Sequence, residues 1–267
     1  MDMITSTSNR YVKLVRSLQE KSWRQKRGLY LIEGLHLVEE AWQRGTPLEV
    51  VLYTPAFSQD SRGSALLAAL QAAGRRCLAV TDNIMGTISA TVTPPGIVAA
   101  APLPACSMAE LLQVPAPLLV VAAGLQDPGN LGTIWRTALG AGATGLILTP
   151  GSVDPFSPKV VRAAMGASFG LPVVTGVEPA VLATELAAAG VKLAVADVGA
   201  ATVLWQADLT GPLALVVGSE NHGPGAELLA AATIKVTIPM VGAVESLNAA
   251  VAAAILLYEA LRQRQGG

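Results

Sequence analysis

The sequence predicts an α/β protein of two domains, the second of them built on a parallel β-sheet. From residue 118 onward, continuous apolar runs alternate with segments of helical periodicity, which is typical of a parallel sheet covered by helices on both faces. A proline-rich stretch at 102–117 separates this half from an earlier and smaller alternation. With 267 residues, 52% of them hydrophobic, the chain is long enough for two cores. We therefore expect domains at 1–101 and 118–267, joined by a short, stiff linker.

The N-terminal domain opens with a helical pattern that starts at Asn9. Apolar residues recur at helical spacing as far as Leu18, and Gly28 is a plausible stop for the same helix. Helical and strand-like patterns then alternate. The remaining expected elements are strands at 29–32, 48–53, 77–80 and 96–100, and helices at 35–44 and 64–73.

The C-terminal domain repeats the alternation with longer strands. The expected strands are 118–122, 145–148, 172–174, 192–196, 213–217 and 234–238. The expected helices are 131–139, 158–167, 179–189, 225–231 and 246–264. In open parallel sheets ligands bind beyond the carboxyl ends of the strands, so the loops that follow these strands are where function is expected.

Composition excludes several classes of protein. No apolar stretch runs for the ~20 residues of a membrane-spanning helix without a charge, Pro or Gly. The first residues lack the basic and apolar blocks of a secretory leader, so we expect a cytoplasmic protein with no membrane partner. Cys77 and Cys106 have neither paired spacing nor a neighbouring His-Cys cluster, so we expect neither a disulfide framework nor a metal site.

Positive charge is concentrated near the N-terminus, although the net charge of the chain is only −1. Seven of the eighteen lysines and arginines lie between residues 10 and 27, against a single acid, Glu20. They are Arg10, Lys13, Arg16, Lys21, Arg24, Lys26 and Arg27. Such a run usually marks the solvated face of a helix, and it also suits contact with phosphates. Taken alone, it leaves both interpretations open.

A glycine motif at Gly140–Gly145 fits the G-x-G-x-x-G pattern of nicotinamide and flavin enzymes. Dinucleotide binding requires these glycines to follow a strand and open a helix, so that the pyrophosphate meets the helix N-terminus. Here they close the helix expected at 131–139 and lead into the strand at 145–148. We therefore interpret them as a helix stop and a tight turn.

Three loops after strands of the C-terminal domain carry polar residues. In the first, Asn130 can cap the next helix, and Arg136 projects from a helix face of otherwise small residues; taken alone, this arginine is better explained by a surface salt bridge. In the second, three glycines allow a backbone to approach a ligand closely, and Glu220 places a carboxylate at the strand end. In the third, Ser246 is a possible helix cap and Asn248 offers an amide. Together they predict one site at one edge of the sheet.

These loops resemble the three signature motifs of the SpoU/TrmH family, SPOUT-class RNA ribose 2′-O-methyltransferases. The first motif is N-x-G-x-x-x-R at 130–136, the second is G-S-E-x-x-G at 218–223, and the third combines I-P-M at 238–240 with S-L-N-x-x-V-A at 246–252. The similarity spans essentially all of 118–267. The N-terminal domain resembles, more loosely, a small RNA-binding α/β domain related to a ribosomal-protein fold that often precedes this catalytic domain.

The resemblance implies a deep trefoil knot, which is otherwise rare among protein folds. In this family the knot loops hold S-adenosylmethionine, mainly through backbone groups. By position, this implicates Gly218, Ile238 and Leu247 as cofactor-binding residues, with Met240 and Ala249 nearby. No dedicated acidic ligand for the cofactor ribose is expected.

The resemblance also implies roles in catalysis. Arg136 is the candidate for activating the ribose 2′-hydroxyl; because a guanidinium stays protonated, stabilising the developing alkoxide is easier for it than acting as a base. Asn130 and Glu220 are expected to orient Arg136 and the ribose. Ser246 and Asn248 are expected to complete the hydrogen-bonding frame.

RNA recognition is then expected from the N-terminal domain, because residues 118–267 carry seven basic and ten acidic residues. The candidate phosphate contacts are Arg10, Lys13, Lys21, Arg24, Lys26 and Arg27. The final helix is apolar on all sides near its start, which together with the resemblance predicts a homodimer through this helix and the knotted domain.

Several functions remain open at this point. Ribosomal RNA of the 23S type is favoured as substrate over transfer RNA because the two-domain layout resembles the ribosomal members of the family. The alternatives are methylation of transfer RNA, methylation of a base, and a non-catalytic RNA-binding protein that keeps the fold. A nicotinamide oxidoreductase is the remotest of them.

Overall fold

The computed structural model describes residues 3–219, 222–242 and 244–266. Glu220 lies outside these residues. The chain forms two compact units, each described here by itself. The first unit contains Met1–Pro104 together with Asp154–Phe169, and the second contains Ala105–Val153 together with Gly170–Gly267. Among the described residues, no helix has the length and apolar character needed to cross a membrane.

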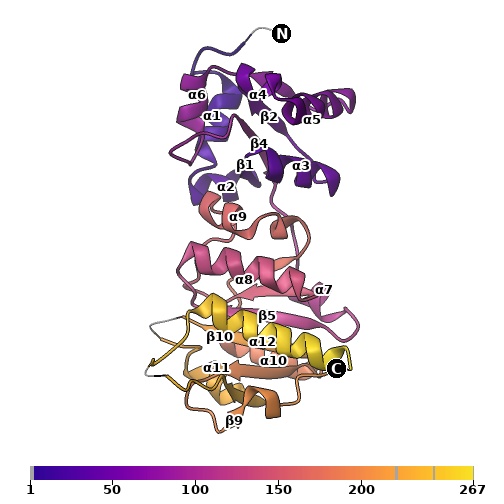
Figure 1. Ribbon diagram of the computed structural model, residues 1–267, viewed down its shortest axis with the longest axis vertical. Coiled ribbons are helices and arrows are strands. Elements are labelled where there is room, and N and C mark those ends of the chain that lie inside the picture. The colour runs from indigo at the N-terminus through magenta and orange to yellow at the C-terminus, as the bar shows by residue number, and fades with distance from the viewer. Residues whose placement is uncertain (1–2, 220–221, 243, 267) are drawn as a thin grey trace. The chain divides into compact units, whose positions relative to one another are not determined.

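The sheet of the first unit has four strands in the order β1-β4-β2-β3 (Figure 1). Its strands are β1 (Leu29–Glu33), β2 (Val50–Tyr53), β3 (Cys77–Ala79) and β4 (Ile97–Pro102). Strand β4 runs antiparallel to both β1 and β2, whereas β2 and β3 are parallel. The sheet lies close to the expected strands, and β4 extends two residues beyond its prediction.

The helices of the first unit pack around this sheet. They are α1 (Arg10–Ser17), α2 (Lys21–Arg27), α3 (Leu35–Gln43), α4 (Pro55–Gln59), α5 (Ser61–Ala72), α6 (Asp82–Ile88) and α9 (Pro158–Ala164), with a 3-10 turn η1 (Ala167–Phe169). On one face Val12 and Val15 of α1 join Leu31, Leu52 and neighbouring side chains in a buried cluster. Burial of this apolar face fixes α1 against the sheet.

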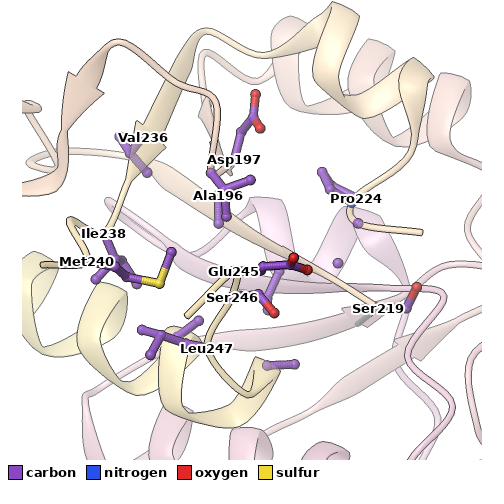
Figure 2. Close-up of a pocket in the computed structure, with 16 residues that line it drawn as sticks. Ala196, Asp197, Ser219, Pro224, Val236, Ile238, Met240, Glu245, Ser246 and Leu247 are labelled. Atoms are coloured by element: carbon purple, nitrogen blue, oxygen red, sulfur yellow. The ribbon is translucent and has the colours of Figure 1, made fainter. Parts of the chain in front are cut away.

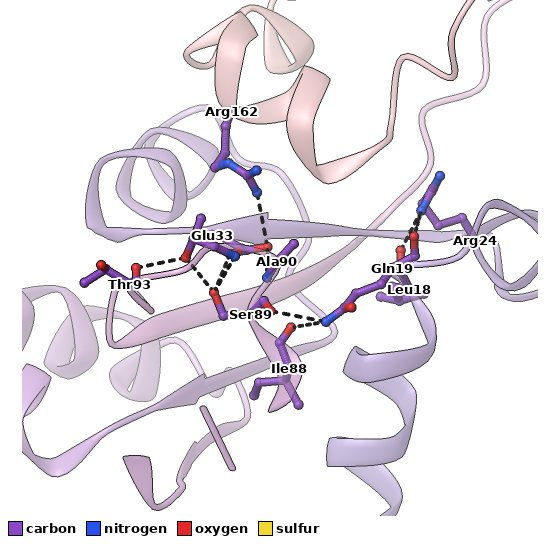
Figure 3. Close-up of polar contacts among 10 residues, drawn as sticks. Leu18, Gln19, Arg24, Glu33, Ile88, Ser89, Ala90, Thr93 and Arg162 are labelled. Atoms are coloured by element: carbon purple, nitrogen blue, oxygen red, sulfur yellow. Dashed lines mark hydrogen bonds and ion pairs between the residues drawn. The ribbon is translucent and has the colours of Figure 1, made fainter. Parts of the chain in front are cut away.

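The helix expected from Asn9 to Gly28 is in fact two helices, separated after Ser17. Tertiary hydrogen bonds account for the break. The Arg24 guanidinium donates to the carbonyls of Leu18 and Gln19, at 2.8 and 2.9 Å, and the Gln19 amide donates to Ile88 and Ser89 of another segment (Figure 3). Gly28, in the left-handed conformation at φ 63°, ends α2 as expected.

The segment 154–169 packs within the first unit through polar and aromatic contacts. Asp154 forms a buried ion pair with Arg24, and Phe156 stacks at a tilt on Tyr30 with ring centroids 5.0 Å apart. Arg162 lies 3.6 Å from Glu33, whose carboxylate also accepts hydrogen bonds from Ser89 and Ala90 (Figure 3). Ion pairs to Arg24 and Glu33, each more than a hundred residues earlier in the chain, thus hold this segment within the first unit.

The sheet of the second unit has seven strands in the order β7-β6-β5-β10-β8-β11-β9, and every recorded pairing is parallel. Its strands are β5 (Leu118–Ala123), β6 (Gly145–Leu148), β7 (Val173–Thr175), β8 (Lys192–Ala196), β9 (Thr202–Val203), β10 (Leu213–Gly218) and β11 (Ile234–Thr237). The predicted parallel sheet is confirmed, and β9 is an addition to it.

Helices cover both faces of this sheet (Figure 1). The helices are α7 (Met108–Leu112), α8 (Pro128–Gly140), α10 (Pro179–Ala188), α11 (Ala226–Ala231) and α12 (Ala249–Arg264), with a 3-10 turn η2 (Leu204–Gln206). On one face, α10 and α11 pack against alternate residues of β5, β8 and β10. The intervening strand residues point to the other face, where α12 contacts β10 and α8. The sheet core is therefore sealed on both sides, and ligands can approach it at the strand ends.

Candidate active site

The site lies at one edge of the second unit's sheet, where four neighbouring strands end. In spatial order these strands are β5, β10, β8 and β11. Because all are parallel, the loops that follow Ala123, Ala196, Gly218 and Thr237 meet at the same edge. The three loops predicted from sequence are among them, and the loop after β8 is the fourth.

A pocket of about 280 Å³ opens at this edge (Figure 2). All five residues predicted to bind the cofactor line it: Gly218, Ile238, Met240, Leu247 and Ala249. Its walls are mostly apolar side chains, among them Val217 and Val236, with backbone from the loop after β10. Such a slot suits a flat apolar group that is held by backbone hydrogen bonds.

Two carboxylates also line the pocket, Asp197 and Glu245 (Figure 2). Asp197 directly follows β8; its backbone N–H donates to Val236 at 2.9 Å, and its Oδ1 accepts from Gly199 at 3.0 Å. Sequence reasoning did not single out Asp197, because a lone Asp after a strand belongs to no motif. Asp197 directly follows a predicted strand of the same sheet as the strands that carry the motifs, and this position was the signal that could have identified it. A pocket with acidic groups favours a ligand that carries positive charge.

Gly218 is required by a close approach of two backbone segments. A Cβ atom at this position would lie 1.9 Å from the carbonyl carbon of Gly223 and 2.1 Å from the nitrogen of Pro224. Ser219 and Gly223 pair across a tight loop through backbone bonds of 3.1 and 2.9 Å, and Ser219 also donates to Ala123 of β5. The glycine therefore allows the loop to fold back over the strand end, which shapes one wall of the pocket.

A hydrogen bond joins the first and third predicted loops. The side-chain N–H of Asn248 donates to Oδ1 of Asn130 at 2.9 Å, across 118 residues of sequence. Asn248 also caps α12, since its Oδ1 accepts from Ala250 and Val251. The sequence assigned this cap to Ser246, which instead lines the pocket.

The cap of α8 was likewise predicted one turn too late. Asp127 is the N-cap, with Pro128 in the first turn, and Oδ1 of Asp127 accepts from the backbone of Asn130 at 2.7 Å. The Asn130 side chain is thereby left to contact Asn248 rather than its own helix end. Arg136 lies on the same helix, is exposed, and makes no hydrogen bond or ion pair to another described residue.

In the first unit, the predicted phosphate contacts divide into two groups. Arg10, Lys13, Lys21, Lys26 and Arg27 are exposed on α1 and α2. Arg24 is 3% exposed and its guanidinium is occupied by Asp154, Leu18 and Gln19. The prediction for Arg24 is therefore wrong in this structure, because a buried and fully paired cation cannot reach a phosphate.

In the described part of the chain, no three potential ligands among His, Cys, Asp and Glu gather into a group that could hold a metal ion. The two cysteines are free thiols. Burial raises the pKa of the Cys77 thiol to about 11, so this side chain remains protonated and unreactive near neutral pH.

Comparison with known families assigns both halves of the chain. The SpoU rRNA Methylase family matches residues 117–258, and an MRM3-like substrate binding domain matches residues 9–99. The first match covers all strands of the second unit's sheet and the residues that line the pocket.

Characterised proteins match along nearly their whole length. A 23S rRNA (guanosine(2553)-2′-O)-methyltransferase from Bacillus subtilis is 35% identical over 97% of this chain and 98% of its own. A 23S rRNA (uridine(2479)-2′-O)-methyltransferase from Streptomyces viridochromogenes is 30% identical over 99% and 93%. A crystal structure of an AdoMet-bound rRNA methyltransferase from Sinorhizobium meliloti superimposes with a TM-score of 0.86 at 32% identity, covering 98% of both chains.

Proposed function

Because the chain belongs to the SpoU rRNA Methylase family, we propose that it transfers a methyl group from S-adenosylmethionine to a ribose 2′-hydroxyl of ribosomal RNA. The observation that carries the proposal is the Asn248–Asn130 hydrogen bond. It joins the helix that bears Arg136 to the loop that lines the pocket. This bond supports a proposal in which Arg136, as the hydroxyl-activating group, acts beside the cofactor pocket.

The pocket has the chemistry that this cofactor requires. S-adenosylmethionine supplies a methyl carbon made electrophilic by the positive sulfonium. The apolar walls around Ile238 and Leu247 suit its adenine, and the backbone at Gly218 offers hydrogen bonds close to the ligand. Asp197 and Glu245 favour its positive charge, so the pocket matches the cofactor at both its apolar and its cationic parts.

Residues of the chain position and activate the nucleophile, which is the ribose 2′-hydroxyl. A ribose hydroxyl is a very weak acid, so it must be positioned and stabilised as it loses its proton. Arg136 stays protonated and stabilises the developing alkoxide, while Asn130, held by Asn248, fixes the orientation. Ser246 adds a hydroxyl at the pocket wall, and Glu220 is proposed to orient the ribose.

The knot of the SPOUT class is part of the proposal. Its support is that the loop after β10 and the loop after β11 line a single pocket, although α11 and β11 separate them in sequence. A chain that passes one loop through the other would hold both against the cofactor.

We include a homodimer in the proposal. The start of α12 exposes an apolar stripe on one side, which is the extra apolar face from which the sequence predicted a partner. Val251 is 48% exposed, Ile255 36% and Tyr258 54%, at the i, i+4, i+7 spacing of one helix face. Covering this stripe with a second copy removes apolar surface from water.

The substrate is proposed from both halves of the chain. The match to a substrate-binding domain at 9–99 covers the exposed cations of α1 and α2, and the relatives from Bacillus subtilis and Streptomyces viridochromogenes are named as 23S rRNA methyltransferases. We therefore place RNA binding on the first unit, favour ribosomal over transfer RNA, and place the protein in the cytoplasm, where ribosomes are assembled.

The test is transfer of a labelled methyl group to unmodified ribosomal RNA. Wild-type protein should modify one nucleotide, and the bond 3′ to it should resist alkali, because a methylated 2′-oxygen cannot attack the phosphate. Arg136→Ala should lower turnover by about 100-fold or more, while cofactor affinity stays within about twofold. Lys192→Ala removes a cation of the same unit that pairs with Asp208 and should leave turnover unchanged.

Three results would contradict the proposal. The first is an alkali-sensitive product, which indicates a methylated base. The second is methylation of transfer RNA alone, and the third is cofactor binding without methyl transfer.

A further inference from the structure

A hollow in the first unit brings together cations and aromatic rings from separate segments. We call it the Tyr11 hollow, and its volume is about 650 Å³. It is lined by Arg10, Tyr11, Lys13, Leu14, Ser17, Trp23, Arg27, Glu49 and Arg76. Helices α1 and α2 supply most of these residues, while Glu49 and Arg76 come from just before β2 and β3. Arg76 lies far from the basic run in sequence, so charge counting did not reveal it.

The hydroxyl of Tyr11 accepts hydrogen bonds from two of the cations that line the hollow. Nη2 of Arg10 donates to it at 2.6 Å, and Nη1 of Arg76 also donates to it. A phenol oxygen has two lone pairs and one proton. With both lone pairs engaged by guanidinium N–H groups, the Tyr11 O–H remains as a donor. Its best partner is a further acceptor, and two adjacent cations favour one that is negatively charged.

The positions of the two guanidinium groups strengthen this conclusion. Their carbon atoms lie 4.6 Å and 4.9 Å from the centroid of the Tyr11 ring, for Arg10 and Arg76 respectively. The two like charges repel each other, and a bound anion offsets that repulsion. Each guanidinium has five N–H donors, so both keep donors for such an anion after bonding to Tyr11.

An indole ring lies beside these cations. Trp23 is half-buried in the wall of the hollow, with the ammonium of Lys26 4.8 Å and the guanidinium of Arg27 5.6 Å from its ring centroid. Aromatic rings next to cations form the usual surface for unpaired nucleotides, whose bases and sugars contact the ring while the cations follow the backbone. A paired helix keeps its bases stacked inside, so it offers no base face to the ring.

We propose that the Tyr11 hollow binds a backbone phosphate of an unpaired RNA segment. Tyr11, Arg10 and Arg76 hold the phosphate, and Trp23 contacts the adjoining nucleotide. This inference rests on the proposed function for its substrate, and it adds where in the first unit that substrate binds and in what form. Glu49, the one acid among the lining residues, places a negative charge near the phosphate and therefore weakens its binding.

The experiment measures binding of a 12-nucleotide single-stranded RNA and of a 12-base-pair RNA duplex at several salt concentrations. Arg76→Gln should weaken single-strand binding about 5- to 10-fold and reduce the log–log salt slope by about 0.7. Tyr11→Phe, which keeps the packed ring and every charge, should weaken it about 3-fold. Glu49→Gln should strengthen it about 2-fold.

The matched control is Arg75→Gln. Arg75 is the neighbouring exposed arginine, but its guanidinium lies 6.0 Å from the ring of Trp42, and it does not line the hollow. It should change affinity less than 2-fold. The inference is overturned if Arg76→Gln and Arg75→Gln have equal effects, if Tyr11→Phe has none, or if the duplex binds as tightly as the single strand.

Methyl transfer to ribosomal RNA, measured on the same variants, separates the two proposals. Normal ribose methylation by the wild-type protein with equal effects of the two arginine variants refutes the hollow alone. Selective loss of single-strand binding in Arg76→Gln, from a wild-type protein that transfers no methyl group to ribose, refutes the proposed function and supports the hollow.

Discussion

One arginine in each unit shows how differently the fold can use a guanidinium group. In the first unit, Arg24 is 3% exposed and its guanidinium donates to Asp154, Leu18 and Gln19. In the second unit, Arg136 is exposed on α8 and has no partner among the other described residues. An arginine in a basic run proved structural, and an arginine on a helix of mostly small and apolar residues is the candidate catalyst. The fold therefore separates two arginines that charge counting does not: one is buried with its guanidinium occupied, and the other is exposed without a partner among the described residues.

The largest expected effect comes from breaking the buried pair. Asp154→Ala leaves the Arg24 guanidinium buried without its counterion, which costs about 3–5 kcal/mol in the free energy of unfolding. Urea denaturation followed by circular dichroism measures this loss.

The matched control breaks an exposed pair in the same unit. Arg62 and Glu39 lie 2.7 Å apart with 64% and 27% of their side chains exposed, so Glu39→Ala should cost less than about 1 kcal/mol. Equal losses in the two variants would show that burial does not distinguish the pairs.

The next effect tests the wall of the pocket. Gly218→Ala places a methyl group on the backbone of Gly223 and Pro224, so the loop must move, and affinity for S-adenosylmethionine should fall by about 100-fold or more. Calorimetric titration measures it. Gly242→Ala is the control, because a Cβ there meets nothing within 4 Å. A Gly218→Ala protein with normal affinity would mean that the loop after β10 does not hold the cofactor.

The second unit was the easier one to predict from sequence. Its parallel strands are buried on both faces and read as continuous apolar runs, so the predicted strand at 213–217 matches β10 to within one residue. The two-residue strand β9 is too short to leave a pattern. The five residues predicted to bind the cofactor line one pocket because the motif-bearing loops meet at one edge, whereas Asp197 also lines it but belongs to no motif.

The first unit was harder because distant partners shape its elements. The end of α1 depends on Arg24 and on the carbonyls near Ile88, which no local periodicity reveals. The packing of Asp154–Phe169 within this unit depends on ion pairs to Arg24 and Glu33 that are more than a hundred residues away. Arg76 reaches the Tyr11 hollow through sheet topology, and sequence order gives no sign of it.

Two substitutions of Asn248 have smaller expected effects and distinguish its role in stability from its role in turnover. Asn248→Ala removes the cap of α12 and the bond to Asn130, and should cost about 1 kcal/mol in stability as well as at least about tenfold in turnover. Asn248→Asp keeps the capping oxygen but loses the N–H donor, so it should retain stability and lose turnover. Thermal denaturation and methyl-transfer assays measure the two quantities. Normal turnover in Asn248→Asp would mean that the bond to Asn130 has no part in the reaction.

The smallest effect concerns the charge of the pocket. Asp197→Asn keeps an oxygen for the Gly199 N–H and removes only the negative charge, so affinity for S-adenosylmethionine should fall about fivefold. Asp208→Asn is the matched control near the other end of β8, where hydrogen bonds from Lys192 and Thr210 lower the pKa of Asp208 and keep it charged, far from the pocket. The product S-adenosylhomocysteine lacks the sulfonium charge, so Asp197→Asn should weaken its binding less than that of the cofactor. Equal weakening of both ligands would mean that Asp197 acts on a part they share, such as the ammonium or the ribose, and not on the charge that makes the methyl group transferable.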